Sequence, residues 1–209
     1  MNSQDIRIEI RRKGMLMVIS GPSGVGKNTI KDGIFKQIKN DLRFSVSYTT
    51  RPIRKNEKDG RDYHFTNREK FFELMKYDKF VEWAEVHQNF YGTTREEIEK
   101  CFSGGYDLLM DVDVKGSNRI KSLYPEAITL FIMPPSLHAL EDRLRKRGID
   151  DIDLRIRLVQ AEKEISEAKN YDYIIINDEI EDSITNAVAI LKAERCRNSR
   201  IEIMFKKGV

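Results

Sequence analysis

The sequence predicts an α/β protein built on a central parallel sheet. Two observations support this prediction: short, almost wholly apolar runs recur along the chain, and stretches with helical spacing of apolar residues separate them. Strands that are apolar on both faces are typical of a parallel sheet covered by helices on both sides. Ligands bind such sheets at the carboxyl ends of the strands, so the residues that follow each run are the candidates for function.

The elements follow one another in a regular order. The run MLMVIS at residues 15–20 leads into glycines and then into residues 28–38, whose isoleucines and phenylalanine fall on one helical face. Ser136 has the position of an N-cap for a helix that Gly148 ends. The expected strands are residues 15–20, 106–113, 127–133 and 171–178.

A polar segment interrupts this alternation. The stretch RPIRKNEKDGRDYHF is rich in turn residues, and a helix capped by Thr66 or Asn67 follows it. The runs FVEWAEV and FYGTT, joined by HQN, predict a hairpin. We expect an inserted substrate domain at 48–97, a core at 14–47 and 98–200, and terminal extensions at 1–13 and 201–209, the last being a frayed tail.

The composition excludes several classes of function. The 209 residues are 40% apolar and 34% charged, with no apolar run near the ~20 residues of a spanning helix and no secretory signal. Cys101 and Cys196 lie far apart and are expected to be reduced thiols, which indicates the cytoplasm. The net charge of +3 is too small to indicate nucleic acid, and the three histidines form no ligand cluster. We expect neither a nucleic-acid nor a membrane partner.

The segment GPSGVGKNTI, residues 21–30, fits a phosphate-binding loop with one unusual residue. It lies between a predicted strand and a predicted helix, where glycines let backbone N–H groups approach phosphate oxygens. Lys27 is expected to reach the β- and γ-phosphates of a nucleotide, whereas Asn28 stands where a hydroxyl usually helps to hold Mg²⁺. The expected nucleotide-binding residues are Gly21, Ser23, Gly24, Val25, Gly26, Lys27, Asn28 and Thr29.

The order of the remaining motifs resembles guanylate kinases. SVSYTTRPIRKNEKDGRDYHF, FVEWAEV, YGTTREEIE, LLMDVDVKG, FIMPPS, LRKRG and IIIND follow the phosphate loop, so the resemblance covers residues 14–200. Its most specific elements are T-T-R-x-x-R and D-Y-x-F. The resemblance implies a P-loop kinase with an inserted GMP-binding domain and a helical lid at about 143–160. It also implies Mg²⁺-dependent transfer of the γ-phosphoryl of ATP to GMP or dGMP, giving ADP and GDP in purine nucleotide metabolism.

The resemblance also implies a GMP site. Arg51 and Arg54 would hold the phosphate, which suits the planar, two-pronged donor set of arginine. Glu82 would accept from the N1–H and 2-amino groups of guanine, two donors that adenine does not present together. The implied GMP-binding residues are Ser47, Arg51, Arg54, Tyr63, Glu82, Tyr91, Thr93 and Asp113.

Two aspartates end a predicted strand as D-V-D, so their side chains point to the same face. The resemblance directs Asp113 toward the guanosine, and Asp111 toward Mg²⁺, directly or through water, together with Asn28. The residues alone leave an alternative open, in which the pair caps the helix expected at VKGSNRI.

The last implied feature is a pair of lid arginines, Arg147 and Arg157, that flank GIDDID and close over the triphosphate. Their spacing is about one residue shorter than guanylate kinases usually show. Asn177 and Asp178 would contact the adenosine end. The implied catalytic residues are Lys27, Arg51, Arg147 and Arg157. Three neighbouring arginines are expected to be solvated: Arg143, Arg145 and Arg155.

Two other functions are alternatives to a GMP kinase. A binding module that has lost catalysis would degrade the phosphate loop, but Lys27 is present. A kinase for another small phosphate acceptor would not need the guanine-facing set around Glu82. Asn28 offers a carbonyl oxygen in place of a hydroxyl and Thr29 follows it, so we interpret the change as tolerated. Both a monomer and a homodimer remain open.

Overall fold

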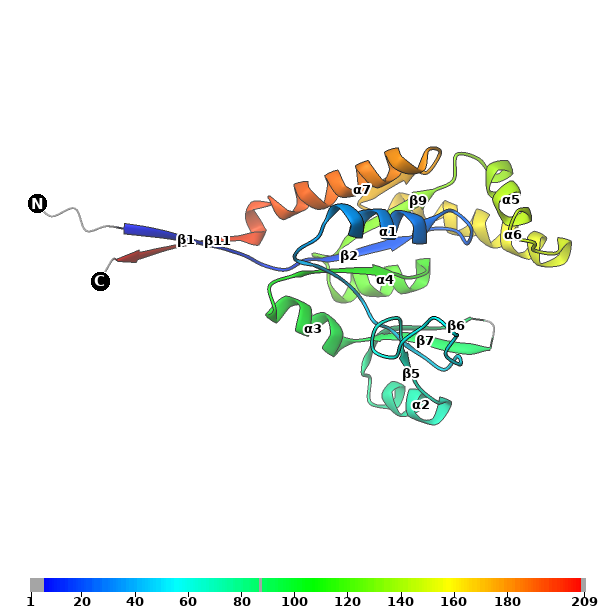
Figure 1. Cartoon of the computed structure of the whole chain (residues 1–209), viewed down its shortest axis with the longest axis horizontal. Helices are drawn as coiled ribbons and strands as arrows, with labels where there is room; N and C mark the ends of the chain where they lie inside the picture. The colour runs from blue at the N-terminus through cyan, green and yellow to red at the C-terminus, as the bar shows by residue number, and fades with distance from the viewer. Residues whose placement is uncertain (1–5, 87, 208–209) are drawn as a thin grey trace, which may run out of the picture.

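The computed structural model describes residues 6–86 and 88–207, and its core is a five-stranded parallel sheet with the strand order β10-β9-β2-β8-β3 (Figure 1). Four of these strands confirm the predicted apolar runs. The fifth, β3, has only three residues and was not predicted. The strands are β2 (Leu16–Ser20), β3 (Leu42–Phe44), β8 (Asp107–Asp111), β9 (Ile128–Met133) and β10 (Tyr173–Ile176).

Helices cover both faces of this sheet because its strands are apolar on both sides. In β2, Met17 and Ile19 pack toward α1 and α7, whereas Leu16 and Val18 pack toward α3 and α4. Gly33 of α1 allows the close approach of α7, since a Cβ there would lie 2.4 Å from a side-chain carbon of Ile184. The helices are α1 (Lys27–Gln37), α7 (Ile180–Arg195), α3 (Arg95–Ser103) and α4 (Val114–Leu123).

Two further helices, α5 (Leu137–Arg145) and α6 (Asp151–Ser166), lie together at the end of the molecule to which the parallel strands point (Figure 1). The predicted cap of α5 is confirmed, because the Ser136 side chain accepts from the Ala139 amide. Gly148 has a φ of 75° in the turn after this helix. None of the helices in the described parts of the chain is long and apolar enough to span a membrane.

The interrupting segment forms a separate four-stranded sheet in the order β5-β4-β7-β6. The predicted hairpin is confirmed as antiparallel β6 and β7, although His87 in its turn lies outside the described residues. Asn67 rather than Thr66 caps the helix, which packs Phe71 on Phe80 with ring centroids 4.5 Å apart. The elements are β4 (Tyr48–Thr49), β5 (His64–Phe65), α2 (Arg68–Lys76), β6 (Phe80–Val86) and β7 (Asn89–Thr94).

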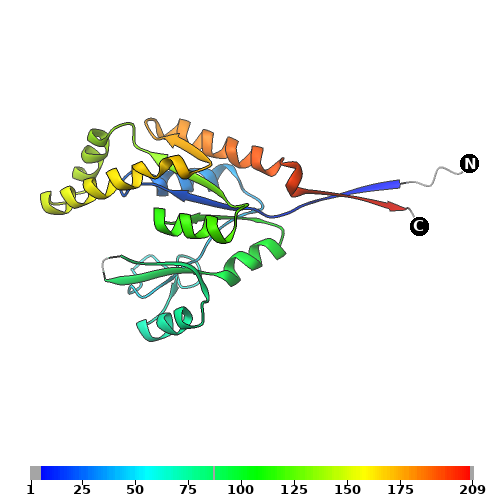
Figure 2. The same ribbon diagram turned by 180° about the vertical axis from the view of Figure 1, so that it is seen from behind.

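The two ends of the chain form a ribbon of two antiparallel strands, β1 (Ile6–Arg12) and β11 (Ile201–Lys207). The expectation of a frayed tail is therefore wrong for residues 201–207. Both chain ends leave the body at the same place, where the Lys13 amide donates to the Arg200 carbonyl, so the backbone groups of each strand find partners in the other. Figures 1 and 2 show the ribbon projecting away from the body.

Candidate active site

The phosphate loop connects β2 to α1 at the carboxyl end of the sheet. Gly21, Gly24 and Gly26 have φ values of 141°, 91° and 105°, which glycine adopts without steric cost. Side chains would also collide here, since a Cβ on Gly21 would lie 2.4 Å from the Ile132 carbonyl oxygen. The glycine spacing is thus required by the backbone, and it leaves the amino end of α1 facing the cleft, as an anion site requires.

Lys27 lies across this loop. Its Nζ donates to the Gly21 carbonyl at 2.7 Å and stands 4.0 Å from an Asp111 carboxylate oxygen. Burial raises the pKa of Asp111, and the Lys27 ammonium opposes this effect. The structure therefore places a positive charge at the loop, with a carboxylate of the neighbouring strand beside it.

The loop is braced from the end of β10. Asn177 is 3% exposed, and its Nδ2 donates to the Val25 carbonyl at 2.6 Å. Its Oδ1 accepts from the Ser183 hydroxyl at 2.9 Å. The Asn177 side chain is therefore committed to holding the loop rather than open to solvent.

Arg143 completes this brace, so the expectation that it is solvated is wrong. Its guanidinium donates to the carbonyls of Val25 at 3.2 Å and Asn177 at 2.8 Å. These partners are backbone atoms more than thirty residues away, so no local pattern in the sequence reports them. Arg145 and Arg155 are exposed as expected, and Arg145 pairs with Glu141 and Asp151.

We expect Arg143→Ala to lower the free energy of unfolding by about 1–3 kcal/mol and to raise the KM for ATP, because two loop-side carbonyls lose a charged donor. Arg145→Ala is the matched control, since this side chain of the same helix is 51% exposed. Thermal unfolding and steady-state kinetics at saturating GMP measure both effects. Equal losses in the two variants would contradict a bracing role for Arg143.

The two arginines predicted for a lid occupy different positions. Arg157 extends from α6 and donates to the Ser23 hydroxyl of the phosphate loop at 3.0 Å. Arg147 is exposed in the turn before α6 and lines a hollow of about 440 Å³ beside the loop. Other residues of this hollow are Gly24, Gly26, Thr29, Arg143, Asn177 and Asp178. The GIDDID segment is a short turn that runs into α6, whose first amides are capped by Asp150.

A second cavity, of about 400 Å³, opens between the two sheets. Its lining residues come from α1, from the end of β8 and from the inserted segment, which are far apart in the sequence. Seven predicted residues line it: Asn28, Ser47, Tyr63, Glu82, Tyr91, Asp111 and Asp113. Arg51, Arg54 and Thr93 are not among the lining residues, whereas Lys31, Phe44, Glu57 and Arg61 line it without having been predicted.

Glu82 is the most unusual group in this cavity. It is 6% exposed, and burial raises its pKa to about 7, an effect that hydrogen bonds from Thr93 oppose and the charge of Asp113 reinforces. The Thr93 amide donates to Glu82 Oε1 at 3.0 Å, and the Thr93 hydroxyl lies 2.9 Å from that of Ser47. Thr93 thus acts behind the cavity wall, where it orients two of the residues that form it.

The two aspartates at the end of β8, Asp111 and Asp113, make different contacts. Asp113 caps α4, since its Oδ1 accepts from the Gly116 amide at 2.7 Å, and it also lines the cavity. The capping alternative is therefore confirmed for this residue without removing it from the site. Asp111 lies on the cavity wall beside Lys27.

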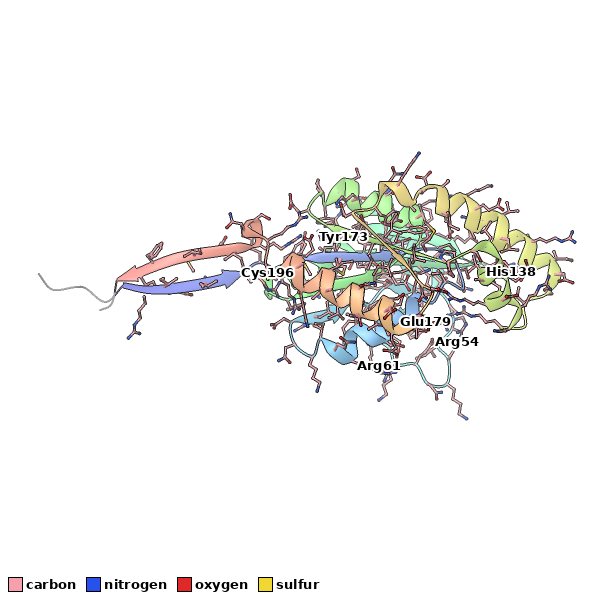
Figure 3. The ribbon with its side chains drawn as sticks, turned by 90° about the horizontal axis from the view of Figure 1, so that it is seen from above. Arg54, Arg61, His138, Tyr173, Glu179 and Cys196 are labelled. Atoms are coloured by element: carbon pink, nitrogen blue, oxygen red, sulfur yellow. The ribbon has the colours of Figure 1, made fainter. Side chains whose placement is uncertain are left out.

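Arg51 is held by a residue that the sequence did not reveal. Its two terminal nitrogens donate to Glu57 at 3.0 and 2.8 Å, and this pairing raises the pKa of Arg51. The Arg54 amide also donates to Glu57, at 2.8 Å, while the Arg54 side chain is exposed. The loop that carries Arg54 and Arg61, both labelled in Figure 3, is therefore organised around the Glu57 carboxylate. Glu57 stands three residues after Arg54, and that spacing is the only signal the sequence offers.

A larger hollow, of about 740 Å³, lies at the opposite end of the sheet. Its wall is mainly apolar, with Leu16, Phe102, Leu123 and Tyr124 among its residues. None of its lining residues belongs to the phosphate loop, and Glu82 is not among them. Predicted site residues instead line the two hollows of about 400 and 440 Å³.

The donor set fits Mg²⁺ as a substrate-borne ion. In the described residues no group of three or more His, Cys, Asp or Glu side chains could hold a metal by itself. Asn28 and Asp111 nevertheless present two oxygen donors on the wall of the same cavity. Mg²⁺ prefers such hard oxygens and commonly binds through one or two protein groups, substrate phosphates and water.

The fold and the two hollows define a P-loop phosphotransferase, an α/β enzyme that holds a nucleoside triphosphate at its glycine-rich loop. The family model for guanylate kinase matches residues 13–194, and the chain belongs to this family. It is 41% identical over 200 residues to a guanylate kinase of Carboxydothermus hydrogenoformans, covering 94% of this chain and 98% of the relative. It is 42% identical over 189 residues to that of Syntrophomonas wolfei, covering 90% and 96%.

The solved structures agree with this family. The crystal structure of guanylate kinase from Anaplasma phagocytophilum matches with a TM-score of 0.72 at 34% identity, covering 92% of each chain. The predicted fold class and family are confirmed.

Proposed function

We propose that the chain transfers the γ-phosphoryl group of ATP to GMP, giving ADP and GDP, with one nucleotide on each side of the phosphate loop. The observation that carries this proposal is the buried carboxylate of Glu82 in a cavity whose wall includes Asp111, which lies 4.0 Å from the Lys27 ammonium. Guanine presents two adjacent donors to such an acceptor. GMP therefore occupies the cavity between the sheets, and ATP occupies the hollow bordered by Gly26 and Arg147.

The GMP phosphate is held by the inserted segment, residues 48–97. Arg51 supplies a two-pronged donor already oriented by Glu57, and Arg54 joins it from the same loop. Tyr63 and Tyr91 line the cavity with ring centroids 5.8 Å apart, and their hydroxyls would help to hold the phosphate. When GMP is bound, the Arg51 guanidinium either donates to the Glu57 carboxylate and the phosphate together, or gives up Glu57 and donates to the phosphate alone.

Catalysis on this proposal is placement and charge stabilisation. A GMP phosphate oxygen is already ionised, so no strong general base is required. Lys27 contacts the transferring phosphoryl, while Arg147 and Arg157 bring further positive charge from the lid, residues 143–160. Mg²⁺, when bound with ATP, would neutralise phosphate charge, and Asn28 and Asp111 would hold its water shell. Asn177 acts through the loop carbonyl that it braces.

The same proposal places the reaction in the cytoplasm, with GMP and ATP as the partners and with no nucleic acid or membrane. A coupled assay of ADP release tests it, using ATP and Mg²⁺ with each nucleoside monophosphate in turn. GMP, and more weakly dGMP, should support turnover. Turnover of AMP within tenfold of GMP would end the assignment of the cavity to guanine.

The unusual Asn28 should be a tolerated variant. Its carbonyl oxygen can replace a hydroxyl near Mg²⁺, so Asn28→Ser should change kcat by less than roughly tenfold, about 1.4 kcal/mol. Steady-state kinetics over a Mg²⁺ titration measure this effect. An inactive wild-type chain that Asn28→Ser activates would show instead that the residue is a lesion.

A further inference from the structure

The terminal ribbon has one apolar face and one charged face. Residues opposite one another in an antiparallel pair share a face, and Ile8 faces Phe205 while Ile10 faces Ile203. The alternate pairs, Arg7 with Lys206, Glu9 with Met204 and Arg11 with Glu202, occupy the other side. The sequence alternation therefore gathers four large apolar side chains on a single side of the ribbon.

This apolar face is open to solvent. Ile8, Ile10, Ile203 and Phe205 are 62%, 64%, 56% and 71% exposed. Figure 3 shows the ribbon extending beyond Cys196 and away from His138 at the opposite end of the molecule, so the body does not cover it. The charged face needs no cover, because Glu9 pairs with Arg11 and Lys206, and Lys13 pairs with Glu202.

The ribbon has too little support from its own two strands. A two-stranded pair is marginally stable at best in water, and independent stability requires more strands or packing on a hydrophobic face. Its strands also come from the two ends of the chain, so no short turn holds them together. A bound partner on the apolar face would supply the missing packing.

We infer that the apolar face of the terminal ribbon binds the same face of a second copy of this chain. At roughly 100–150 Å² exposed per large side chain, the four residues offer on the order of 500 Å². Two such faces together bury on the order of 1,000 Å², which reaches the lower limit of specific interfaces. An edge-to-edge pairing of ribbons would leave this apolar face in water, so it would not supply the packing that the ribbon lacks.

The shape of the molecule selects the arrangement. Because each ribbon projects from its body, two ribbons can overlap in opposite directions with the bodies at the two ends (Figure 2). A two-fold axis through the centre of the patch then places Ile8 of one copy over Ile10 of the other. The interface is self-complementary, as a two-fold dimer requires, and the nucleotide sites stay open.

Sedimentation velocity and light scattering at about 100 µM protein test this inference, a concentration suited to an interface of this size. Wild-type protein should be dimeric, and Ile203→Asp should weaken association at least about tenfold. Met204→Asp is the matched control, since it introduces the same charge on the neighbouring residue of the opposite face. Turnover of GMP should be unchanged in both variants, because the ribbon lies away from the nucleotide sites.

Mixing supplies a second measurement that does not depend on ribbon stability. Ile8→Asp and Ile10→Lys proteins should each be monomeric, and a mixture of the two should associate through the new Asp–Lys contact. A monomeric wild type, or equal dissociation by Met204→Asp, would overturn the inference. Failure of the mixture to associate would overturn the antiparallel overlap. Binding of a monomeric wild type to lipid vesicles would assign the face to a bilayer instead.

Discussion

AMP should be phosphorylated with a kcat/KM about 10⁴-fold below that of GMP. Adenine offers no pair of adjacent donors to Glu82, so its binding would leave a buried carboxylate, 6% exposed in the free protein, with the Thr93 amide as a donor but none from the base. Sites built on hydrogen bonds to the substrate discriminate this strongly because the unmatched group inside the protein stays unpaired. Competition between GMP and AMP in the coupled assay measures the ratio directly.

Glu82→Gln tests the origin of this selectivity. The amide can accept from one guanine donor but opposes the other with its own N–H groups, so kcat/KM for GMP should fall about 100-fold, or about 2.7 kcal/mol. The matched control is Glu85→Gln, which lies on the same strand and is exposed. An unchanged value for Glu82→Gln would show that the base binds elsewhere.

The same residue should give GMP binding a pH dependence. Guanine requires the ionised carboxylate, and the pKa of Glu82 is raised to about 7 by burial, so KM for GMP should rise as the pH falls below 7. Ionisation of the GMP phosphate near pH 6 contributes equally in Glu82→Gln. The difference between the two pH profiles therefore reports Glu82 alone.

The contribution of Glu82 to folding stability should have the opposite pH dependence: GMP binding weakens as the pH falls, whereas this contribution increases. The folded-state pKa of Glu82 lies above its unfolded value of 4.5, so its protonated form favours folding below pH 4.5. This contribution is lost as the pH rises through about 7. Glu82→Gln should accordingly gain thermal stability relative to wild type at pH 8 and show no such gain at pH 4.

Lys27→Ala should lower kcat by about 10³-fold or more, the range found when a positive group is removed from a transferring phosphoryl. The ammonium is fixed by the Gly21 carbonyl at 2.7 Å and cannot be replaced by another described lysine of the loop. GMP binding should persist in the variant, because Lys27 is not among the residues that line the cavity proposed for GMP. Single-turnover kinetics and calorimetric titration with GMP separate the two effects.

Lys36→Ala is the control for this experiment, since Lys36 lies in the last turn of the same helix and is exposed. It should leave kcat within about twofold of wild type, as surface substitutions usually do. A loss in Lys27→Ala no larger than that of the control would mean that the loop does not hold the reacting phosphates.

Local patterns were sufficient for the framework of the fold and for the loop. The apolar runs of β2, β8, β9 and β10 and the glycines before Lys27 lie within short windows, where periodicity and turn chemistry are informative. The short strand β3 was not predicted because it has only three residues, one of them charged. The pairing of β1 with β11 was not predicted because the two strands lie at opposite ends of the chain, outside any local window.

The site residues also divide into those that a local motif predicts and those that depend on distant partners. Of the residues predicted from motifs, Glu82 and Asp111 line the cavity between the sheets, whereas Arg51 and Arg54 of T-T-R-x-x-R do not. Arg143 and Glu57 were missed because their roles depend on partners that only the folded chain brings near. Arg143 donates to distant backbone carbonyls, and Glu57 accepts from both terminal nitrogens of Arg51.

The brace between Asn177 and the phosphate loop links two positions that are usually considered apart. A Cβ on Gly26 would lie 2.6 Å from the Asn177 side-chain nitrogen, so the last glycine of the loop is required by the residue after β10 as well as by its own φ of 105°. Shortening residue 177 would remove this collision but not the strain of alanine at a φ of 105°, and it would cost the donor to Val25. Divergence at position 177 alone would therefore weaken the loop without freeing position 26 to vary.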